Sequence, residues 1–291
     1  MVRFGNDITP NEHALAREFV LYDNFYSNGG LSAEGANWAA AAIAPAFTVK
    51  LAPSAFAARS TIFTFAGGDP ANTPSAGYLW SNAEQAGLSV RNYGEWVTNT
   101  PSPQPVGQKQ VQKTSDPSLA AITDLNFRGS DSAYKDTDRA EEFIREWKTF
   151  DSQGKAPQLS IVRLGNDAAS RGGPPTAAMA ADNDRAFGML VDAVSHSRLW
   201  ASTAIFVVQV SGEQGSDHVD PHRTPCWVLS PYTHRGTVDS AFFNQTSVLR
   251  TIELILGMRP MTIFDAGAKS MFGSFAEQAS TTPFTALMPK S

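Results

Sequence analysis

The sequence predicts an α/β protein with a mostly parallel sheet and helices on both of its faces. Short apolar runs alternate with amphipathic segments along the 291 residues, as expected when helices connect buried parallel strands. The clearest runs, Thr203–Val210 and Thr224–Leu229, are rich in β-branched residues and flank a polar segment. Because 42% of the residues are hydrophobic and 18% are charged, we expect residues 1–291 to form one domain with a large core.

Each element is predicted from its periodicity and its end signals. Thr9 and Pro10 predict a helix start, because threonine caps helices and proline fits the first turn. We expect further helices at Asn37–Val49, Tyr78–Ala86, Asp138–Phe150, Thr176–His196 and Ser247–Leu256. We expect further strands at Phe19–Phe25, Leu88–Tyr93 and Leu159–Leu164. Residues 50–117 are predicted to form a loop-rich excursion over the site, in which the proline-rich segment Thr98–Pro117 is a loop.

The polar segment between the two apolar runs is a candidate site. Asp217, His218, Asp220, His222 and Arg223 place acids, imidazoles and one fixed cation within seven positions. Ligands of open α/β sheets bind beyond the carboxyl ends of the strands, which is where this segment lies. His218 is the preferred proton carrier, because an imidazole exchanges protons near neutral pH, and Arg223 suits an anionic group. The alternative is that an Asp-His pair only ties this loop to a neighbouring helix.

A family resemblance extends over most of the chain. It is carried, in order, by TPNEHALAREFVLYDNFY, SAEGANW, GYLWSNAEQAGLSVRNYGE, VRLGNDA, AADNDRAFGMLVDAVSHS, GSDHVDPHR, SPYTHRG and LRTIELILGMRPM. These segments resemble the bacterial phosphoesterase family, relatives of phospholipase C and acid phosphatase within the alkaline phosphatase superfamily. The resemblance implies an alkaline-phosphatase-like, doubly wound fold and a metal-dependent phosphate-ester hydrolase. It also implies that Ser32 stands at the position of the family's nucleophile.

The chain departs from the family pattern at the positions that the resemblance assigns to metal binding. Ala36 and Ala168 stand where the family has histidines, and Val210 and Ser211 stand where it has a pair of acids. The family also has a strand and a Glu-Asn metal-binding pair upstream of the segment that matches Arg3–Thr9, so we expect the domain to be N-terminally truncated. Alanine and valine side chains cannot ligate a divalent ion, so we expect no metal or other cofactor.

Three functions remain open. The first is a metal-independent enzyme that acts on a small organic substrate by acid/base chemistry of the isomerase, cyclase or lyase type. Its candidate catalytic residues are His218, Asp217, Ser32, Glu34 and Glu213, and its candidate substrate-binding residues are Asn37, Asp167, Asp220, His222 and Arg223. The second is a residual phosphate-ester hydrolase with Ser32 as nucleophile. The third is a catalytically inactive pseudoenzyme that binds a ligand or partner.

The net charge and the composition limit the classes of partner that the protein is expected to bind. A net charge of −5 without a basic cluster argues against nucleic acid and anionic membranes. The chain as written has no secretion signal and no apolar run of about 18 residues, so no membrane span is predicted and a cytoplasmic location is expected. A sheet that lacks the family's first strand exposes an edge, so we expect a homo-oligomer or a partner chain that covers it. Cys226 is expected to be a buried small hydrophobe.

Overall fold

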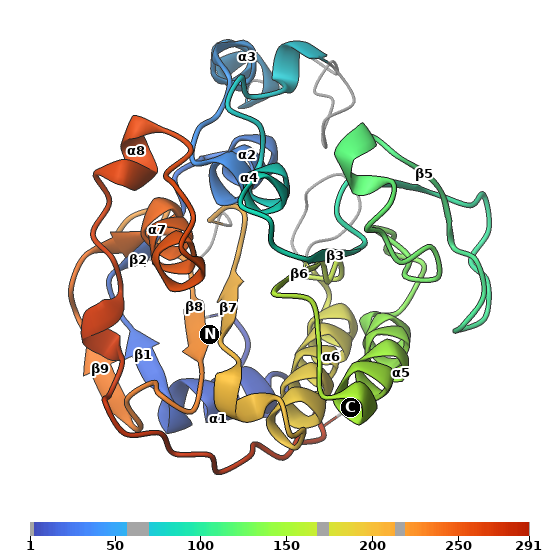
Figure 1. The fold of residues 1–291 in the computed structure, drawn as a ribbon, viewed down its shortest axis with the longest axis vertical. Coiled ribbons are helices and arrows are strands. Elements are labelled where there is room, and N and C mark those ends of the chain that lie inside the picture. Colours follow the sequence, from blue (N-terminus) through green and yellow to red (C-terminus); the bar gives the residue numbers. More distant parts are fainter. Residues whose placement is uncertain (1–2, 57–69, 168–174, 213–218, 291) are drawn as a thin grey trace.

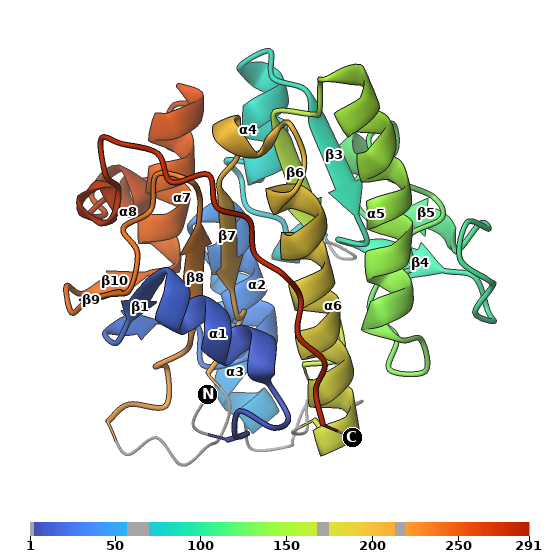
Figure 2. The same ribbon diagram turned by 90° about the horizontal axis from the view of Figure 1, so that it is seen from below.

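The fold is a three-layer α/β arrangement. The computed structural model describes residues 3–56, 70–167, 175–212 and 219–290. The strands form the middle layer, with α1, α5 and α6 on one face and α2, α4 and α7 on the other (Figures 1 and 2). This arrangement confirms the predicted α/β fold with helices on both faces of a sheet.

Strand pairing within the described residues is predominantly parallel. The parallel pairs are β1 (Val20–Tyr22) with β9 (Thr237–Asp239), β2 (Phe25–Tyr26) with β10 (Phe243–Asn244), and β3 (Val90–Tyr93) with β6 (Leu159–Val162). The antiparallel pairs are β4 (Val97–Asn99) with β5 (Val111–Thr114), and β7 (Ile205–Val208) with β8 (Cys226–Leu229). The mostly parallel sheet predicted from the sequence is therefore confirmed.

The helices follow the amphipathic segments. The first face carries α1 (Pro10–Glu18), α5 (Asp136–Gln153) and α6 (Ala177–Ser195). The second face carries α2 (Ser32–Ala41), α4 (Leu79–Gln85) and α7 (Gln245–Leu256), with α3 (Ala46–Phe56) and α8 (Ile263–Ala266) beside them. Short 3₁₀ helices occupy Pro70–Asn72, Pro117–Leu119, Trp200–Ser202 and Phe272–Ser274. No helix among the described residues is long and apolar enough to span a bilayer.

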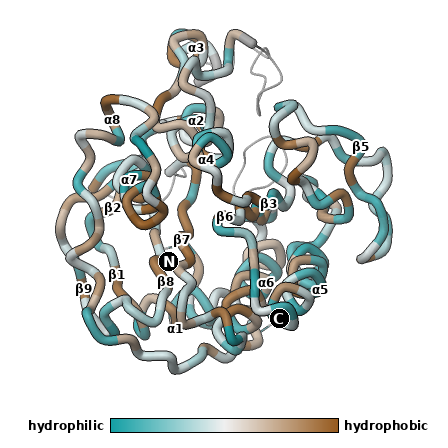
Figure 3. The backbone as a smooth tube through the Cα atoms, viewed as in Figure 1, coloured by the Kyte–Doolittle hydropathy of each residue, from teal (hydrophilic) through white to brown (hydrophobic). Residues whose placement is uncertain are grey.

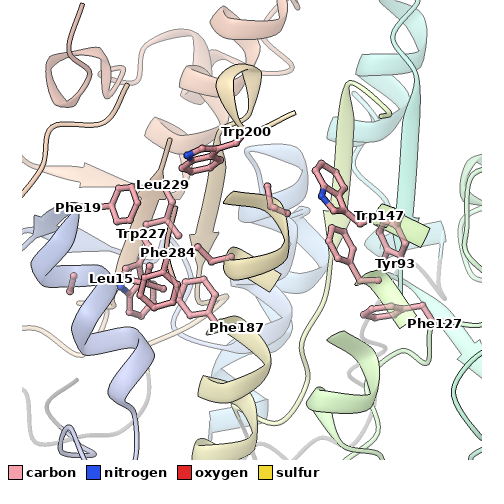
Figure 4. Close-up of a cluster of buried hydrophobic side chains, with 14 residues drawn as sticks. Leu15, Phe19, Tyr93, Phe127, Trp147, Phe187, Trp200, Trp227, Leu229 and Phe284 are labelled. Atoms are coloured by element: carbon pink, nitrogen blue, oxygen red, sulfur yellow. The ribbon is translucent and has the colours of Figure 1, made fainter. Parts of the chain in front are cut away.

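Each face of the sheet has its own hydrophobic core. On the first face Leu15, Phe187 and Trp227 belong to one aromatic-rich cluster between the helices and strands (Figure 4). On the second face Trp80 and Leu249 pack in a separate cluster with residues of α2, β3 and β6. Strand β7 and helix α7 consist largely of hydrophobic residues, whereas α5 is largely hydrophilic (Figure 3). Burial of each large side chain contributes about 1.5–3 kcal/mol, so these two cores hold the three layers together.

The predicted helix Asn37–Val49 is wrong in its limits, because it consists of parts of two helices. α2 begins five residues earlier, at Ser32, and ends at Ala41, followed by Ala42, whose φ of 56° is left-handed. α3 begins only after Pro45. Proline disfavours a helical conformation in the residue before it, which explains the break between the two helices. The predicted strand Phe19–Phe25 is likewise divided, into β1 and β2.

Two further predictions need correction. The segment Thr98–Pro117 was expected to be a loop, but it contains β5 and most of β4, which pair as an antiparallel hairpin. Its closely spaced prolines lie between the two strands, where they remove no hydrogen bond from the ladder. The runs Thr203–Val210 and Thr224–Leu229 were expected as parallel strands, yet β7 and β8 pair with each other in antiparallel register, Val208 opposite Cys226. The residues after β7 and those before β8 therefore lie at the same edge of the sheet.

Candidate functional site

The candidate site begins where the first turn of α2 meets the end of β7. The hydroxyl oxygens of Ser32 and Ser211 lie 3.0 Å apart and share a hydrogen bond. A Cβ atom on Gly35 would lie 1.3 Å from the carbonyl oxygen of Val210, so only glycine permits this approach of the helix to the strand end. The sequence therefore places Ser32 against Ser211 by means of a glycine one turn further along the helix.

The His222 segment lies beside the same strand end. The hydroxyl of Ser27 accepts a hydrogen bond from the Gly212 N–H at 3.3 Å, and the Ser27 N–H donates to the His222 carbonyl at 2.8 Å. A Cβ atom on Gly212 would lie 1.8 Å from the carbonyl oxygen of Pro221, so the two segments are in direct contact. The fold thus brings Ser32, Ser211 and His222 into one region, although His222 is far from Ser32 in the sequence.

Asp220 and His222 form an accessible acid–imidazole pair. Asp220 Oδ1 lies 2.9 Å from His222 Nδ1 and also accepts the His222 backbone N–H at 2.8 Å. These hydrogen bonds lower the pKa of Asp220, the backbone one most strongly. The side chains are 45% and 44% exposed, so a substrate can reach the imidazole. The neighbouring Arg223 forms an isolated antiparallel bridge with Tyr26, which fixes its backbone beside β2.

Glu34 and Asn37 project from α2 and have structural contacts. One carboxylate oxygen of Glu34 accepts the Leu31 N–H at 3.3 Å, which caps the helix. Asn37 is 2% exposed and donates from Nδ2 to the Ala33 carbonyl at 2.9 Å and to Asn72 at 3.4 Å. Its Oδ1 atom is buried and has no hydrogen-bond partner among the described residues. Asn37 therefore connects α2 to the excursion that contains Asn72 and retains one acceptor.

Of the remaining residues predicted to belong to the site, the structure describes Asp167 but not Glu213, Asp217 or His218. Asp167 follows β6, is partly buried, and helps to raise the pKa of Glu12. Three residues predicted to be catalytic, Glu213, Asp217 and His218, lie outside the described residues, as does Ala168.

Glu12 is a titratable group with a raised pKa that the sequence analysis did not single out. It lies on the first turn of α1, where its backbone N–H donates to Asp184 Oδ1 at 2.8 Å. Burial raises the pKa of Glu12 to about 7, and the negative charges of Asp184 and Asp167 act in the same direction. A carboxyl group with this pKa can carry a proton at neutral pH.

A buried network supports the loop after β6. Asp136 is fully buried, pairs with Arg139 at 2.7 Å, and accepts the backbone N–H groups of Gly165 and Asn166 at 3.0 and 2.8 Å. Asn183 donates to the same carboxylate at 2.8 Å. Asp182 accepts the Asp136 N–H at 2.6 Å and the Asn166 side chain at 3.3 Å. Sequence reasoning missed Asp136, whose contacts hold this loop against the start of α5.

The described residues do not fit the divalent ion of the family pattern. Where the acid pair would stand, the Val210 carbonyl packs on Gly35 and the neutral Ser211 hydroxyl bonds Ser32. Ala36 is buried and offers only a methyl group. Within residues 3–56, 70–167, 175–212 and 219–290, no group of three or more His, Cys, Asp or Glu side chains is placed to hold a metal. Divalent ions in proteins prefer charged oxygen or imidazole ligands, which these positions lack.

Helices cover both faces of a mostly parallel sheet, and Ser32 on the first turn of α2 contacts Ser211 just beyond β7, which defines an α/β protein with a serine beside a strand end. The match to a family model extends over residues 1–259. The chain belongs to the Phosphoesterase family. No curated protein matches the sequence.

Solved structures of similar fold come from several bacteria. A protein of the alkaline phosphatase superfamily from Vibrio parahaemolyticus has a TM-score of 0.55 and 15% identity; the match covers 90% of this chain and 63% of that one. The phosphonate monoester hydrolase SpPMH from Silicibacter pomeroyi has a TM-score of 0.54 and 13% identity; the match covers 94% of this chain and 72% of that one. The lipoteichoic acid synthase LtaP from Listeria monocytogenes has a TM-score of 0.56 and 11% identity; the match covers 92% of this chain and 70% of that one. At these identities the comparison establishes the fold, and the chain spans less than two thirds of the Vibrio protein.

Proposed function

We propose that this phosphoesterase-like protein is a metal-independent enzyme that acts on a small organic substrate with an anionic group. The observation that supports the proposal is the meeting of Ser32, Ser211 and the Asp220–His222 pair at one edge of the sheet. The His222 imidazole is accessible, and its segment contacts Ser27 and Gly212 beside the Ser32–Ser211 pair. Two of the family's acidic positions are replaced by Val210 and Ser211. This combination favours proton transfer over metal-assisted hydrolysis.

Substrate binding is assigned to the start of α2. The first turn of a helix leaves backbone N–H groups without intrahelical partners, and the helix dipole adds a partial positive charge. The hydroxyls of Ser32 and Ser211 supply two further donors at the same place once their mutual hydrogen bond opens. A phosphate or carboxylate group is the natural ligand for such a set of donors.

Proton transfer is assigned to His222. Because the Asp220 carboxylate accepts from Nδ1, that nitrogen carries a hydrogen and Nε2 is left for the substrate. Asp220 also stabilises the charged imidazole that forms when His222 takes a proton. The chemistry is therefore proton abstraction and return, of the kind that isomerases, cyclases and lyases use. His218 is the alternative carrier in the same segment and lies outside the described residues.

A second candidate is metal-free hydrolysis of a phosphate ester with Ser32 as nucleophile. It is favoured by the position of Ser32 on the first turn of α2, where a transferred phosphoryl group would meet the helix start. It is disfavoured because Ser32 bonds another hydroxyl and not a base, and an unactivated serine is a poor nucleophile.

The first experiment separates these functions with phosphate and p-nitrophenyl phosphate as probes. Inorganic phosphate should bind in the presence of chelator, as measured by calorimetry, and Ser32→Ala with Ser211→Ala should weaken it by roughly tenfold. Elemental analysis of the purified protein should find no stoichiometric metal. Hydrolysis of p-nitrophenyl phosphate that zinc or manganese restores and chelator abolishes would contradict the proposal.

The second experiment tests the proton carrier. A bacterial metabolite extract is incubated with the chelated wild-type protein and with His222→Asn, and the changes are followed by mass spectrometry. A conversion by wild type should fall by roughly 10²–10⁴ in His222→Asn, with the fold intact. The same loss in His218→Asn alone would move the role to His218. Phosphate binding without any conversion by the wild type would support the inactive, ligand-binding function instead.

A further inference from the structure

Helices α2, α7 and α8 lie close together on the second face of the sheet (Figure 1). Residues of these helices and of the adjoining segments line a pocket to which Ser32, Ser211 and His222 do not contribute. Its volume is about 350 Å³, within the range that holds a small organic molecule. The residues that matter for its chemistry are Asn28, Trp38, Phe242, Thr246, Phe264 and Lys269. Trp38 follows Ser32 by six residues on α2, which places it about 9 Å along the helix axis from the Ser32–Ser211 contact.

Three of the residues that line the pocket are aromatic. Trp38 and Phe264 pack edge to face with centroids 5.1 Å apart, and Phe242 stacks on Tyr26 at 5.5 Å. Phe242 is nevertheless 58% exposed and Phe264 46% exposed. Exposed rings around a concavity favour a planar apolar ligand, which can stack on them and remove their surface from water.

The pocket also carries positive charge. The Lys269 ammonium lies 5.2 Å from the ring centroid of Phe243, and it has no ion pair with any carboxylate of the described residues. Thr246 belongs to the first turn of α7, a 12-residue helix whose dipole is positive at this end. A ligand with a negative charge would therefore be favoured here, and a cationic ligand disfavoured.

A buried hydrogen-bond acceptor, the side-chain oxygen of Asn28, is a third feature of the pocket that bears on the ligand it would bind. The backbone N–H of Asn28 donates to Gln245 Oε1 at 2.9 Å, which holds this residue against the start of α7. Its side-chain Oδ1 is buried and has no hydrogen-bond partner among the described residues. An unpaired buried acceptor is unfavourable, so a small rotation of the Asn28 side chain that exposes Oδ1 to the pocket would let a ligand donate an O–H or N–H to it and gain binding energy.

We propose that this pocket binds a small aromatic anion that carries a hydrogen-bond donor, of the hydroxylated aromatic carboxylate class. The ring stacks between Trp38, Phe264 and Phe242, the carboxylate meets Lys269, and the donor reaches Asn28. The assignment is independent of the function proposed for the Ser32 region, because it uses none of those residues.

The test uses 4-hydroxybenzoate as the probe, with binding measured by calorimetry and by saturation-transfer NMR. We expect a Kd on the order of 1 mM or tighter, as small ligands of this size give in a partly open pocket. Benzoate, which lacks the donor, should bind several-fold more weakly, and 4-hydroxybenzylamine, which is cationic, should not bind. Lys269→Met should weaken 4-hydroxybenzoate roughly five- to tenfold, whereas Lys148→Met, on an exposed site of α5, should have no effect.

Two further variants locate the bound probe. Asn28→Ala should remove the preference for 4-hydroxybenzoate over benzoate, and Ser32→Ala should leave the affinity unchanged. Absence of binding, equal affinity in wild type and Lys269→Met, or loss of binding in Ser32→Ala alone would each overturn the assignment. The last result would place the anion at the start of α2 instead.

Discussion

A buried pair of carboxyl groups makes the stability of this protein depend on pH. Glu253 on α7 and Asp265 on α8 are both fully buried, and the nearest cation, Arg250, lies 3.6 Å from Glu253 Oε2. Burial, reinforced by the neighbouring Asp265 carboxylate, raises the pKa of Glu253 to about 8. The folded state therefore keeps a proton on Glu253 that the unfolded chain releases near its ordinary value of 4.5.

The direction and the size of this pH dependence of stability follow from proton linkage. Because the folded state binds the extra proton, its stability is full below the unfolded pKa and is lost as the pH rises toward 8. Each pH unit in this window costs about 1.4 kcal/mol for one proton, or about 2.5 kcal/mol between about pH 5.5 and 7.5. Glu253→Gln keeps the shape and a donor toward Asp265 but cannot ionise, so it should retain that stability.

Urea unfolding across this pH range measures the effect. Wild type and Glu253→Gln should have similar free energies of unfolding at the acid end and differ by about 2 kcal/mol at the alkaline end. Glu12 and Asp124, whose pKa values burial raises to about 7 and about 6, act in both proteins and cancel in the difference. Glu141→Gln, at an exposed site, is the control. Parallel curves for wild type and Glu253→Gln would refute the buried neutral carboxyl.

The remaining predictions concern single contacts described above. Gly35→Ala should destabilise by more than about 3 kcal/mol in thermal or urea unfolding, since its Cβ would overlap the Val210 carbonyl, whereas Gly273→Ala, with open space around it, should change little; equal effects would contradict the close approach. Asp136→Ala should cost about 3–5 kcal/mol, because it leaves a buried arginine without its partner, and a cost below about 1 kcal/mol would argue against that network. The buried Cys226 thiol, whose pKa burial raises, should react with a disulfide reagent only on unfolding; rapid reaction of the native protein would show that the site is accessible.

Elements with strong periodicity and clear end signals could be predicted closely from sequence. Helix α6 begins after Thr176, the residue at which the predicted helix started and whose hydroxyl caps it, and α7 ends at Gly257 in the left-handed conformation. The alanine-rich helices α2 and α3 have little amphipathic pattern, so their limits depend on Pro45 and on tertiary contacts such as Gly35 with Val210. Local propensity carries no information about such contacts.

The site shows the same division. Ser32 could be recognised from the resemblance alone, but its place on the first turn of α2 was missed, because the predicted helix began at Asn37. Its contact with Ser211 could not be predicted, because it depends on the tertiary approach of Gly35 to the Val210 carbonyl. Asp136 was missed because a carboxylate near a helix start is usually a capping group, and only the fold shows that it bonds Gly165 and Asn166.

The antiparallel pairing of β7 with β8 has a consequence for how this protein can diversify. Val208 and Cys226 face each other, so the chain between them leaves and re-enters the sheet at adjacent points. The entropic cost of closing such a segment grows slowly with its length. Insertions, deletions or replacement of the residues between these two points would therefore leave β7 and β8 in register. The segment could be replaced by the corresponding segment of a relative. Chemistry at this edge can change between paralogues while the scaffold remains the same.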